Sequence, residues 1–464
     1  MRNVLWLTVY LVLILLGFPV GSSLEELTTA LESLARGSTE HHETKNKDET
    51  SNVKIIPAAE YFEYLMGQPE KVFKNNRNVT ISYDARNESY RVVPKKNATG
   101  PFVQEANGDF SITNPKIGVK YNAGQFTTYT HQTFKAEPEF TKKNGTFNVV
   151  EIYWSLGAWL QLQYEAAIRG EKAAFLAASN YDGIEEMSGE DDPTVASNLG
   201  DPTQGPAASL GALPGMLLRF YSQIREGKEV LTNKFDDKNP RVHMLKMTGL
   251  NTQNGYVYFT DHLMPGTETK LPKDLEEGTP DKENFESFLR RASYSCGIMY
   301  HKNISVTASN SVASSSRFEN FSVPAPLPTN TIDQIFAAGL SLGQYRNTLI
   351  QEFTKNKVWI EAFADLLAQK IMEDIIALSI RATVKNNAEV LYLLPIGCGV
   401  FGNKHLWLGR ALKKAKDLIV GSGLTINFVF GPNYYRYETP DEYNTFMTTL
   451  KNLVQETGGS YTAL

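Results

Sequence analysis

An apolar run that leads directly into three glycines and then a helix constrains this chain more than any other feature. Residues 389–403 read EVLYLLPIGCGVFGN. The segment 390–394 is continuously apolar, which is typical of a buried parallel strand. Gly397, Gly399 and Gly402 can take positive φ and let backbone N–H groups approach an anion. The pattern predicts an anion-binding loop or, alternatively, a tight strand-to-helix turn without a ligand.

The segment 404–420 that follows has the pattern of a helix. The positive end of its dipole would add to an anion site at the glycines. The glycine spacing matches neither the dinucleotide fingerprint nor the P-loop.

Composition limits the protein class. The chain has 464 residues, of which 42% are hydrophobic and 21% charged, enough for one large or two medium globular domains. Its net charge of −5 argues against a nucleic-acid binder that acts through general electrostatics.

The N-terminus predicts entry into the secretory pathway. The segment 4–18 is almost wholly apolar and is followed by small residues, so we expect a signal peptide over 1–22. A membrane span needs about 20 apolar residues, and no later segment meets that length, so no membrane anchor is expected after cleavage.

Six Asn-x-Ser/Thr sequons agree with this route, although sequons also arise by chance in Asn-rich loops. They predict glycosylation at Asn78, Asn87, Asn97, Asn144, Asn303 and Asn320. The glycine loop lies in a segment without sequons.

The two cysteines, Cys296 and Cys398, could form one disulfide but make no framework. Cys398 lies inside the glycine loop, where a small buried side chain is expected. Only His405 is near it in sequence as a base for thiolate chemistry. The pair His41-His42 has no companion ligands, so we expect neither a metal site nor a cofactor.

The chain divides into four predicted regions. A flexible charged linker over 23–52 follows the signal peptide. A glycosylated β-rich appendage over 53–117 precedes an α/β domain over 118–464. An insertion at about 255–330, with a short hairpin near Gly255 and a Ser/Asn/Pro-rich surface stretch from 305 to 328, interrupts this domain.

Within the α/β domain the pattern predicts alternating helices and strands. Pro214 should kink or divide the helix predicted over 205–224. The last helix should open with a capping box at 439–442 and end at Gly458. The predicted strands are 173–178, 389–394 and 425–430, and the predicted helices are 149–170, 205–224, 332–353, 357–383, 404–420 and 439–457.

This alternation predicts a mainly parallel sheet in a three-layer α/β/α fold. Ligands bind such sheets beyond the carboxyl ends of the strands. The glycine loop stands at one of these ends.

The segment 397–403 resembles the phosphate-binding loop of the macrodomain superfamily, especially its microbial poly(ADP-ribose) glycohydrolase branch. Upstream, a strand that ends at Asn180 is similar to the strand whose Asn contacts the distal ribose. Residues 201–209 take the place of the family's first, glycine-rich loop. The resemblance covers roughly 120–440.

The resemblance implies that ADP-ribose or a related nucleotide is the ligand. Backbone N–H groups of Gly397, Cys398, Gly399, Val400 and Gly402 would hold the diphosphate. The same implied site includes Asn403, Gln204 and Gly205. Phe401 would stack beside the sugar and base, or could be a core side chain. Asn180 would bond a ribose hydroxyl, or could only cap its strand.

The chain departs from the family where catalysis is concerned. The glycohydrolase branch has a triple-glycine loop and a Gln-Glu-Glu set, whereas residues 205–217 contain no Asp or Glu. The candidate general acids are Asp201 and the carboxylates of a nearby acidic segment, which could equally be a solvated loop. These carboxylates are Asp182, Glu185, Glu186, Glu190, Asp191 and Asp192.

Two functions remain open from the sequence. The protein could bind and hydrolyse ADP-ribosyl linkages with Asp201 as the acid. It could instead be a secreted binding module that keeps the fold, has lost the chemistry and uses another ligand or a protein partner. A serine hydrolase is disfavoured because no Gly-x-Ser-x-Gly elbow occurs.

Overall fold

A computed structural model describes most of the chain beyond residue 51. The described residues are 52–135, 137, 140, 144–152, 156–184, 194–223, 230–231, 241–246, 252–253, 256–257, 296–314, 316–342, 357–431 and 438–463. The predicted signal peptide and residues 23–51 of the predicted linker lie outside them.

One sheet of twelve strands organises residues 52–464. Ten strands follow one path, and β5 and β4 extend it from β6. In path order the ten strands are β18 (Tyr461–Ala463), β7 (Thr146–Glu151), β17 (Thr425–Phe430), β16 (Val390–Leu393), β8 (Ala173–Ala178), β15 (Thr331–Ala337), β12 (Ile298–Ser305), β6 (Lys120–Tyr129), β3 (Ser89–Pro94) and β2 (Val79–Asp84), while β4 is Phe102–Gln104 and β5 is Phe110–Thr113.

The sheet has a parallel and an antiparallel half. The six strands from β18 to β15 are parallel, and all pairings from β15 through β12, β6, β3 and β2 are antiparallel. The central parallel strands are buried and apolar, as in β8, where Ala173 to Ala177 are all buried. The expected mainly parallel sheet is confirmed, with an antiparallel extension.

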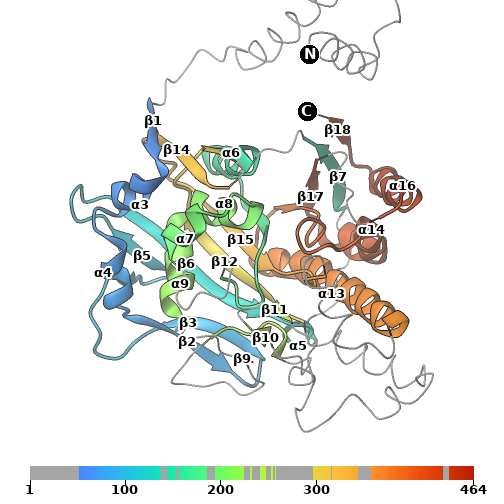
Figure 1. The fold of residues 1–464 in the computed structure, drawn as a ribbon, viewed down its shortest axis with the longest axis horizontal. Helices are drawn as coiled ribbons and strands as arrows, with labels where there is room; N and C mark the ends of the chain where they lie inside the picture. The colour runs from blue at the N-terminus through green and yellow to red at the C-terminus, as the bar shows by residue number, and fades with distance from the viewer. Residues whose placement is uncertain are drawn as a thin grey trace, which may run out of the picture. The chain divides into compact units, whose positions relative to one another are not determined.

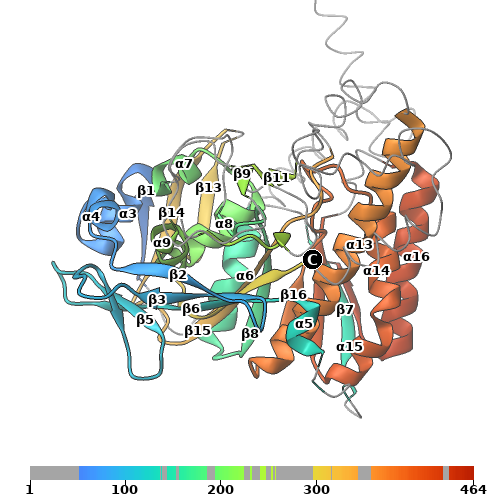
Figure 2. The same ribbon diagram turned by 90° about the horizontal axis from the view of Figure 1, so that it is seen from below.

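Helices cover both faces of this sheet. Gln334 of β15 donates to the Ala208 carbonyl of α8 (2.8 Å), whereas Phe428 of β17 packs against Phe446 of α16. The strand register puts Gln334 and Phe428 on opposite faces. Figure 2 shows α13, α14 and α16 side by side in one layer.

The larger helices of the described residues are α6 (Leu156–Ile168), α8 (Gln204–Gly211), α9 (Leu213–Ser222), α13 (Lys357–Lys385), α14 (His405–Lys414), α15 (Lys416–Ser422) and α16 (Pro440–Thr457). The shorter ones are α3 (Ala58–Met66), α4 (Glu70–Asn75), α5 (His131–Phe134) and α7 (Val195–Leu199). None of the helices in the described ranges is long and apolar enough to cross a membrane.

Two smaller sheets accompany the main one (Figure 1). The first joins β1 (Asn52–Pro57), β14 (Phe318–Ala325) and β13 (Asn310–Ala313), all antiparallel. The second joins β11 (Tyr256–Val257), β10 (Thr252–Gln253) and β9 (Val230–Leu231). The strand pair β10 and β11 confirms the hairpin expected near Gly255.

Several expected elements are confirmed. Strands β8, β16 and β17 lie where the apolar runs predicted them. Pro214 stands in the first turn of α9, and Ala212 separates that helix from α8. Thr439 and Glu442 form the capping box of α16, and Gly458 ends it at φ +69°.

Other expectations were wrong. The helix predicted over 149–170 begins only at α6, because Val149 and Val150 belong to strand β7. The helix predicted from 332 is strand β15 up to Ala337, and 343–353 lies outside the described residues. Both predictions placed β-branched residues in a helix, although such side chains favour strands. The helix predicted over 404–420 is divided at Ala415 into α14 and α15.

The predicted insertion is largely integrated where it is described. Strand β12 pairs with both β6 and β15 inside the main sheet. The predicted surface stretch contains Phe318, Phe321 and Val323 of β14, which are all buried. The predicted appendage likewise continues the main sheet, through strands β2, β3, β4 and β5. The predicted boundary at 117 therefore falls within this sheet, just before β6.

A half-buried carboxyl joins β12 to β15 at a bulge in their pairing. Asp333 accepts from the Tyr300 hydroxyl (2.5 Å) and from the Asn303 backbone N–H (2.8 Å). Burial raises the pKa of Asp333 from 3.8 to about 6, although both hydrogen bonds lower it. Its proton therefore stays on the folded chain at pH values where the unfolded chain releases it.

We expect Asp333→Asn to become more stable relative to the unchanged chain as the pH rises from 4 to 7. The raised pKa of Asp333 makes its full contribution to the stability of the unchanged chain below about pH 3.8. This contribution is lost as the pH rises through about 6. The gain should reach roughly 2–3 kcal/mol. Urea unfolding of both chains across this pH range measures it, and a pH-independent difference would contradict the assignment.

Candidate functional site

Three neighbouring parallel strands end together at one edge of the sheet. Strand β8 lies between β16 and β15, and all three run in the same direction. The Ser179 backbone N–H, just past β8, donates to the Ala337 carbonyl at the end of β15 (2.9 Å). Segments 179–184, 338–342 and 394–403 therefore meet at the carboxyl ends, where open α/β sheets bind ligands.

The glycine loop 394–403 is closed by its own backbone. The Asn403 N–H donates to the Gly397 carbonyl, and the Gly402 N–H to the Gly399 carbonyl, both at 3.0 Å. Gly397 and Gly402 have φ of +72° and +69°, as expected, whereas Gly399 is not in the positive-φ region. Two of the three glycines are thus needed for backbone conformation.

Gly399 instead leaves space. A Cβ built on it would meet nothing within 4 Å. Within the described part of the chain, the backbone N–H groups of Gly397, Gly399 and Val400 donate to no protein acceptor. Val400 is 53% exposed, so this part of the loop faces outward. Backbone N–H groups in such a turn can bind an anion.

Asn403 fastens the glycine loop to the loop after β15. Its buried Nδ2 donates to the carbonyls of Leu340 (2.6 Å), Gly397 (3.1 Å) and Phe401 (3.3 Å). The Leu342 N–H adds a bond to the Phe401 carbonyl (2.7 Å). These bonds hold the two loops together, and a ligand contact by Asn403 stays a prediction.

Gly339 belongs to this site although the sequence reading missed it. A Cβ on Gly339 would lie 2.8 Å from the Gly397 Cα, so the two loops approach too closely for any side chain there. The signal in the sequence is the short apolar run 335–338 followed by Gly339, which is similar to the strand-to-glycine pattern of 390–397.

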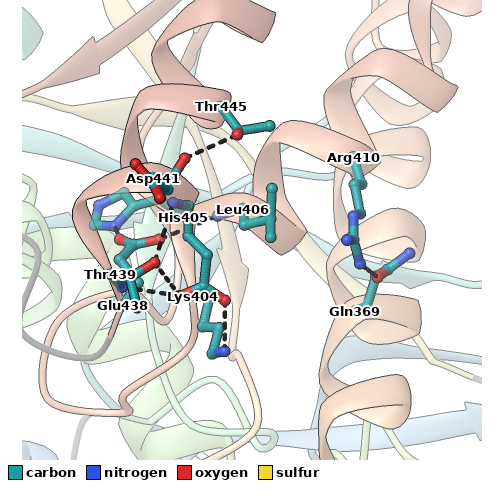
Figure 3. Close-up of polar contacts among 10 residues, drawn as sticks. Gln369, Lys404, His405, Leu406, Arg410, Glu438, Thr439, Asp441 and Thr445 are labelled. Carbon is teal, nitrogen blue, oxygen red and sulfur yellow. Dashed lines mark hydrogen bonds and ion pairs between the residues drawn. The ribbon is translucent and has the colours of Figure 1, made fainter.

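The N-terminus of α14 is occupied by a carboxylate (Figure 3). Glu438 accepts from the Leu406 backbone N–H (3.3 Å) and contacts His405 Nδ1, and both side chains are buried. Lys404, at the N-cap, pairs with Glu442 (2.8 Å). The expectation that this helix dipole would face the anion is therefore wrong, because a carboxylate already interacts with it.

Cys398 is a buried part of the loop. Burial raises the pKa of its thiol well above the ordinary value, and the charge of Glu438 adds to this. His405 is directed to Glu438 and not to the sulfur. A protonated thiol is a poor nucleophile. The burial of Cys398 confirms the small buried side chain that was expected here. Cys296 is also buried, and neither cysteine is in a disulfide.

The first predicted ligand loop also reaches the end of β8. Gln204 Oε1 accepts from the Ala178 backbone N–H (2.8 Å), while its Nε2 has no hydrogen-bond partner. Asn180 is buried two residues past the strand, and its carbonyl accepts from Gly183 N–H (3.0 Å). Gly205 is buried in the first turn of α8. A ribose contact by Asn180 stays a prediction.

Phe401 is half-buried and packs against the hydrophobic core. This agrees with the alternative that it is a core side chain. Its stacking on a base stays a prediction.

Asp182 is unavailable as a general acid. Its carboxylate pairs with Arg241 Nη2 (3.0 Å) and accepts from the Ile184 N–H (3.0 Å). Both charged side chains are at most 1% exposed. The other acidic candidates, Glu185, Glu186, Glu190, Asp191 and Asp192, lie outside the described residues.

Asp201 is half-buried in the turn that leads into α8. Burial raises the pKa of its carboxyl, although hydrogen bonds from the Thr203 side chain and backbone lower it. A raised pKa suits a proton donor, and the bonds to Thr203 also fit a purely structural role at the start of α8.

The described residues also line a small hollow away from the glycine loop. The hollow, lined by Tyr83, Tyr90 and Lys246, has a volume of about 10 Å³, which is roughly one water molecule. The described ranges contain no group of three or more His, Cys, Asp or Glu side chains that could hold a metal ion.

Comparison with known proteins finds similarity only at the level of structure. No family model matches the sequence, and no curated protein matches it. Solved structures of bacterial poly(ADP-ribose) glycohydrolases do match. They are the branch that the loop at 397–403 resembles.

The enzyme from Deinococcus radiodurans in complex with ADP-ribose has a TM-score of 0.33 and 12% identity, covering 70% of this chain and 94% of that one. The enzyme from Thermomonospora curvata has a TM-score of 0.32 and 10% identity, covering 76% and 93%. At these TM-scores and identities, the similarity says nothing of the ligand of this chain.

Proposed function

We propose that this protein binds ADP-ribose or a related nucleotide through the glycine loop at 394–403. The observation that carries the proposal is the set of free N–H groups at Gly397, Gly399 and Val400, at the carboxyl end of β16. The loop resemblance supplies the class of ligand, and the free donors supply a place for its diphosphate.

The surroundings favour a neutral, backbone-based anion site. The Glu438 carboxylate lies at the α14 N-terminus, so binding depends on the loop N–H groups. Hydrogen bonds from N–H to an ionised acceptor are stronger than neutral ones, and the three loop N–H groups are the donors that we propose for the diphosphate.

We expect Gly399→Glu to abolish nucleotide binding without unfolding the protein. The added side chain enters open space beside the free N–H groups, and its charge repels the diphosphate. Fluorescence anisotropy with a labelled ADP-ribose measures the loss, which should exceed tenfold in Kd, or about 1.4 kcal/mol.

The matched control is Ile117→Glu, which adds the same charge at a 64% exposed site on the β5 to β6 turn. Its affinity should equal that of the unchanged chain. Equal affinity for Gly399→Glu would remove the loop from the binding site.

A second candidate function is hydrolysis of an ADP-ribosyl linkage with Asp201 as general acid. The raised pKa of Asp201 favours it, since a general acid must hold its proton near neutral pH. Helices α8 and α9 offer no alternative, because residues 205–217 are buried and contain no carboxylate.

If this second function holds, Asp201→Asn should lower turnover of poly(ADP-ribose) by roughly 100-fold or more and leave ADP-ribose affinity unchanged. The control Asp417→Asn changes an exposed carboxylate on α15 and should keep full turnover. Unchanged turnover in Asp201→Asn would exclude Asp201 as the acid and leave binding as the function.

A further inference from the structure

The six sequons differ sharply in what their side-chain amides do. A glycan needs an amide that points into solvent with room for a sugar, because the modification is bulky. Asn87, Asn97 and Asn144 are exposed, whereas Asn78 is only 8% exposed.

The Asn78 amide is part of the fold. Its Nδ2 donates to the Phe102 carbonyl (2.6 Å), and its Oδ1 accepts from the Phe102 N–H (3.3 Å). Gly100 packs against it so closely that a Cβ there would lie 2.6 Å from Oδ1. A sugar on Nδ2 would push the side chain out and leave the Phe102 backbone without these partners.

The Asn303 amide is equally engaged. It lies at the bulge of β12 with φ +58°, its Nδ2 donates to the buried Asp109 carboxylate (3.0 Å), and its backbone N–H donates to Asp333. A Cβ on Gly124 of β6 would meet the Lys302 and Asn303 carbonyls at 2.0 and 3.1 Å, so the backbone is tightly packed there.

The exposed sequons have no such constraint. Asn97 is in a surface turn with φ +57°. Asn144 precedes β7 and therefore lies at the amino ends of the parallel strands, opposite the glycine loop. Asn87 donates to Asp84 (2.8 Å) at the surface, and its amide keeps one N–H after glycosylation.

We propose that the folded protein carries N-glycans at Asn87, Asn97 and Asn144 and none at Asn78 or Asn303. The proposal rests on the predicted signal peptide and is independent of the nucleotide site. Asn320, half-buried on β14, is not part of it.

The reaction joins Nδ2 to the anomeric carbon of an oligosaccharide. The bond from that carbon to a lipid diphosphate breaks, the lipid diphosphate leaves, and the amide releases one proton. A chain that is glycosylated at Asn78 or Asn303 cannot form the hydrogen bonds of that side chain. Such a chain does not reach the folded state and is absent from the purified folded protein.

The test is site mapping on the full chain produced in secretory eukaryotic cells and purified as folded protein. Enzymatic removal of N-glycans in ¹⁸O water converts each glycosylated Asn to labelled Asp, which mass spectrometry of the peptides detects. We expect label at Asn87, Asn97 and Asn144. Label at Asn78 or Asn303, or no label at any exposed site, would overturn the proposal.

Matched variants separate glycan loss from structural damage. Asn144→Gln, at an exposed position without a positive φ, should lose one glycan and keep its melting temperature. Asn78→Gln should keep the glycan count of the unchanged chain and melt several degrees lower, because the bonds to Phe102 are lost. A glycan lost in Asn78→Gln without a change in melting temperature would contradict the assignment.

Discussion

Replacing Asp182 by alanine should lower the free energy of unfolding by about 3–5 kcal/mol, the largest effect we expect from a single substitution. The change leaves the guanidinium of Arg241 charged, buried and without its carboxylate, since Nε and Nη1 of Arg241 have no hydrogen-bond partner among the described residues. It also frees the Ile184 N–H. Urea unfolding monitored by fluorescence measures the loss.

Two comparisons control this result. Glu63→Ala breaks an exposed pair with Lys116, whose side chains are 57% and 62% exposed, and should cost about 1 kcal/mol or less. The double variant Asp182→Leu/Arg241→Met removes both charges and should be more stable than Asp182→Ala. A loss below about 1 kcal/mol in Asp182→Ala would show that Asp182 is not locked in the fold.

Asn403→Ala should both destabilise the protein and abolish nucleotide binding. It removes the two amide N–H donors that contact three backbone carbonyls, worth about 1 kcal/mol for each donor, and empties a buried side-chain site. We therefore expect the free energy of unfolding to fall by about 3–4 kcal/mol. Without this fastening, the glycine loop no longer holds its free N–H groups in place. Urea unfolding and ADP-ribose titration measure the two effects.

The matched control is Asn386→Ala, which removes amide bonds to the Ala382 carbonyl and the Tyr129 hydroxyl just past the end of α13. Asn386 precedes β16, whereas the glycine loop follows that strand. It should lose stability but keep affinity. Gly339→Ala serves as a second variant in case Asn403→Ala does not fold, because its Cβ pushes the two loops apart. Full affinity in both site variants would contradict the positioning role.

Local patterns in the sequence predict those elements that local physics determines. The apolar runs at β8, β16 and β17 and the Thr439 capping box are short-range signals, and all are confirmed. The β7 and β15 segments failed because apolar spacing alone does not separate a helix from a buried strand. Their pairing partners are far away in the sequence.

The site follows the same division. The glycine loop was predicted because its glycines and its strand are contiguous. Gly339 and Leu340 could not be assigned, because they meet the loop only once β15 and β16 flank β8. Glu438 reaches His405 from 33 residues away, so nothing local in the sequence indicates that it caps α14.

Calorimetric titration of the full, unchanged chain with ADP-ribose tests the central claim most directly, with AMP and inorganic pyrophosphate as comparisons. If the free N–H groups of the glycine loop hold a diphosphate, ADP-ribose should bind with a micromolar Kd, near −8 kcal/mol, and AMP should bind more weakly. Pyrophosphate should compete with ADP-ribose. No heat from ADP-ribose, or equal affinity for AMP, would mean that the loop is a turn and not a diphosphate site.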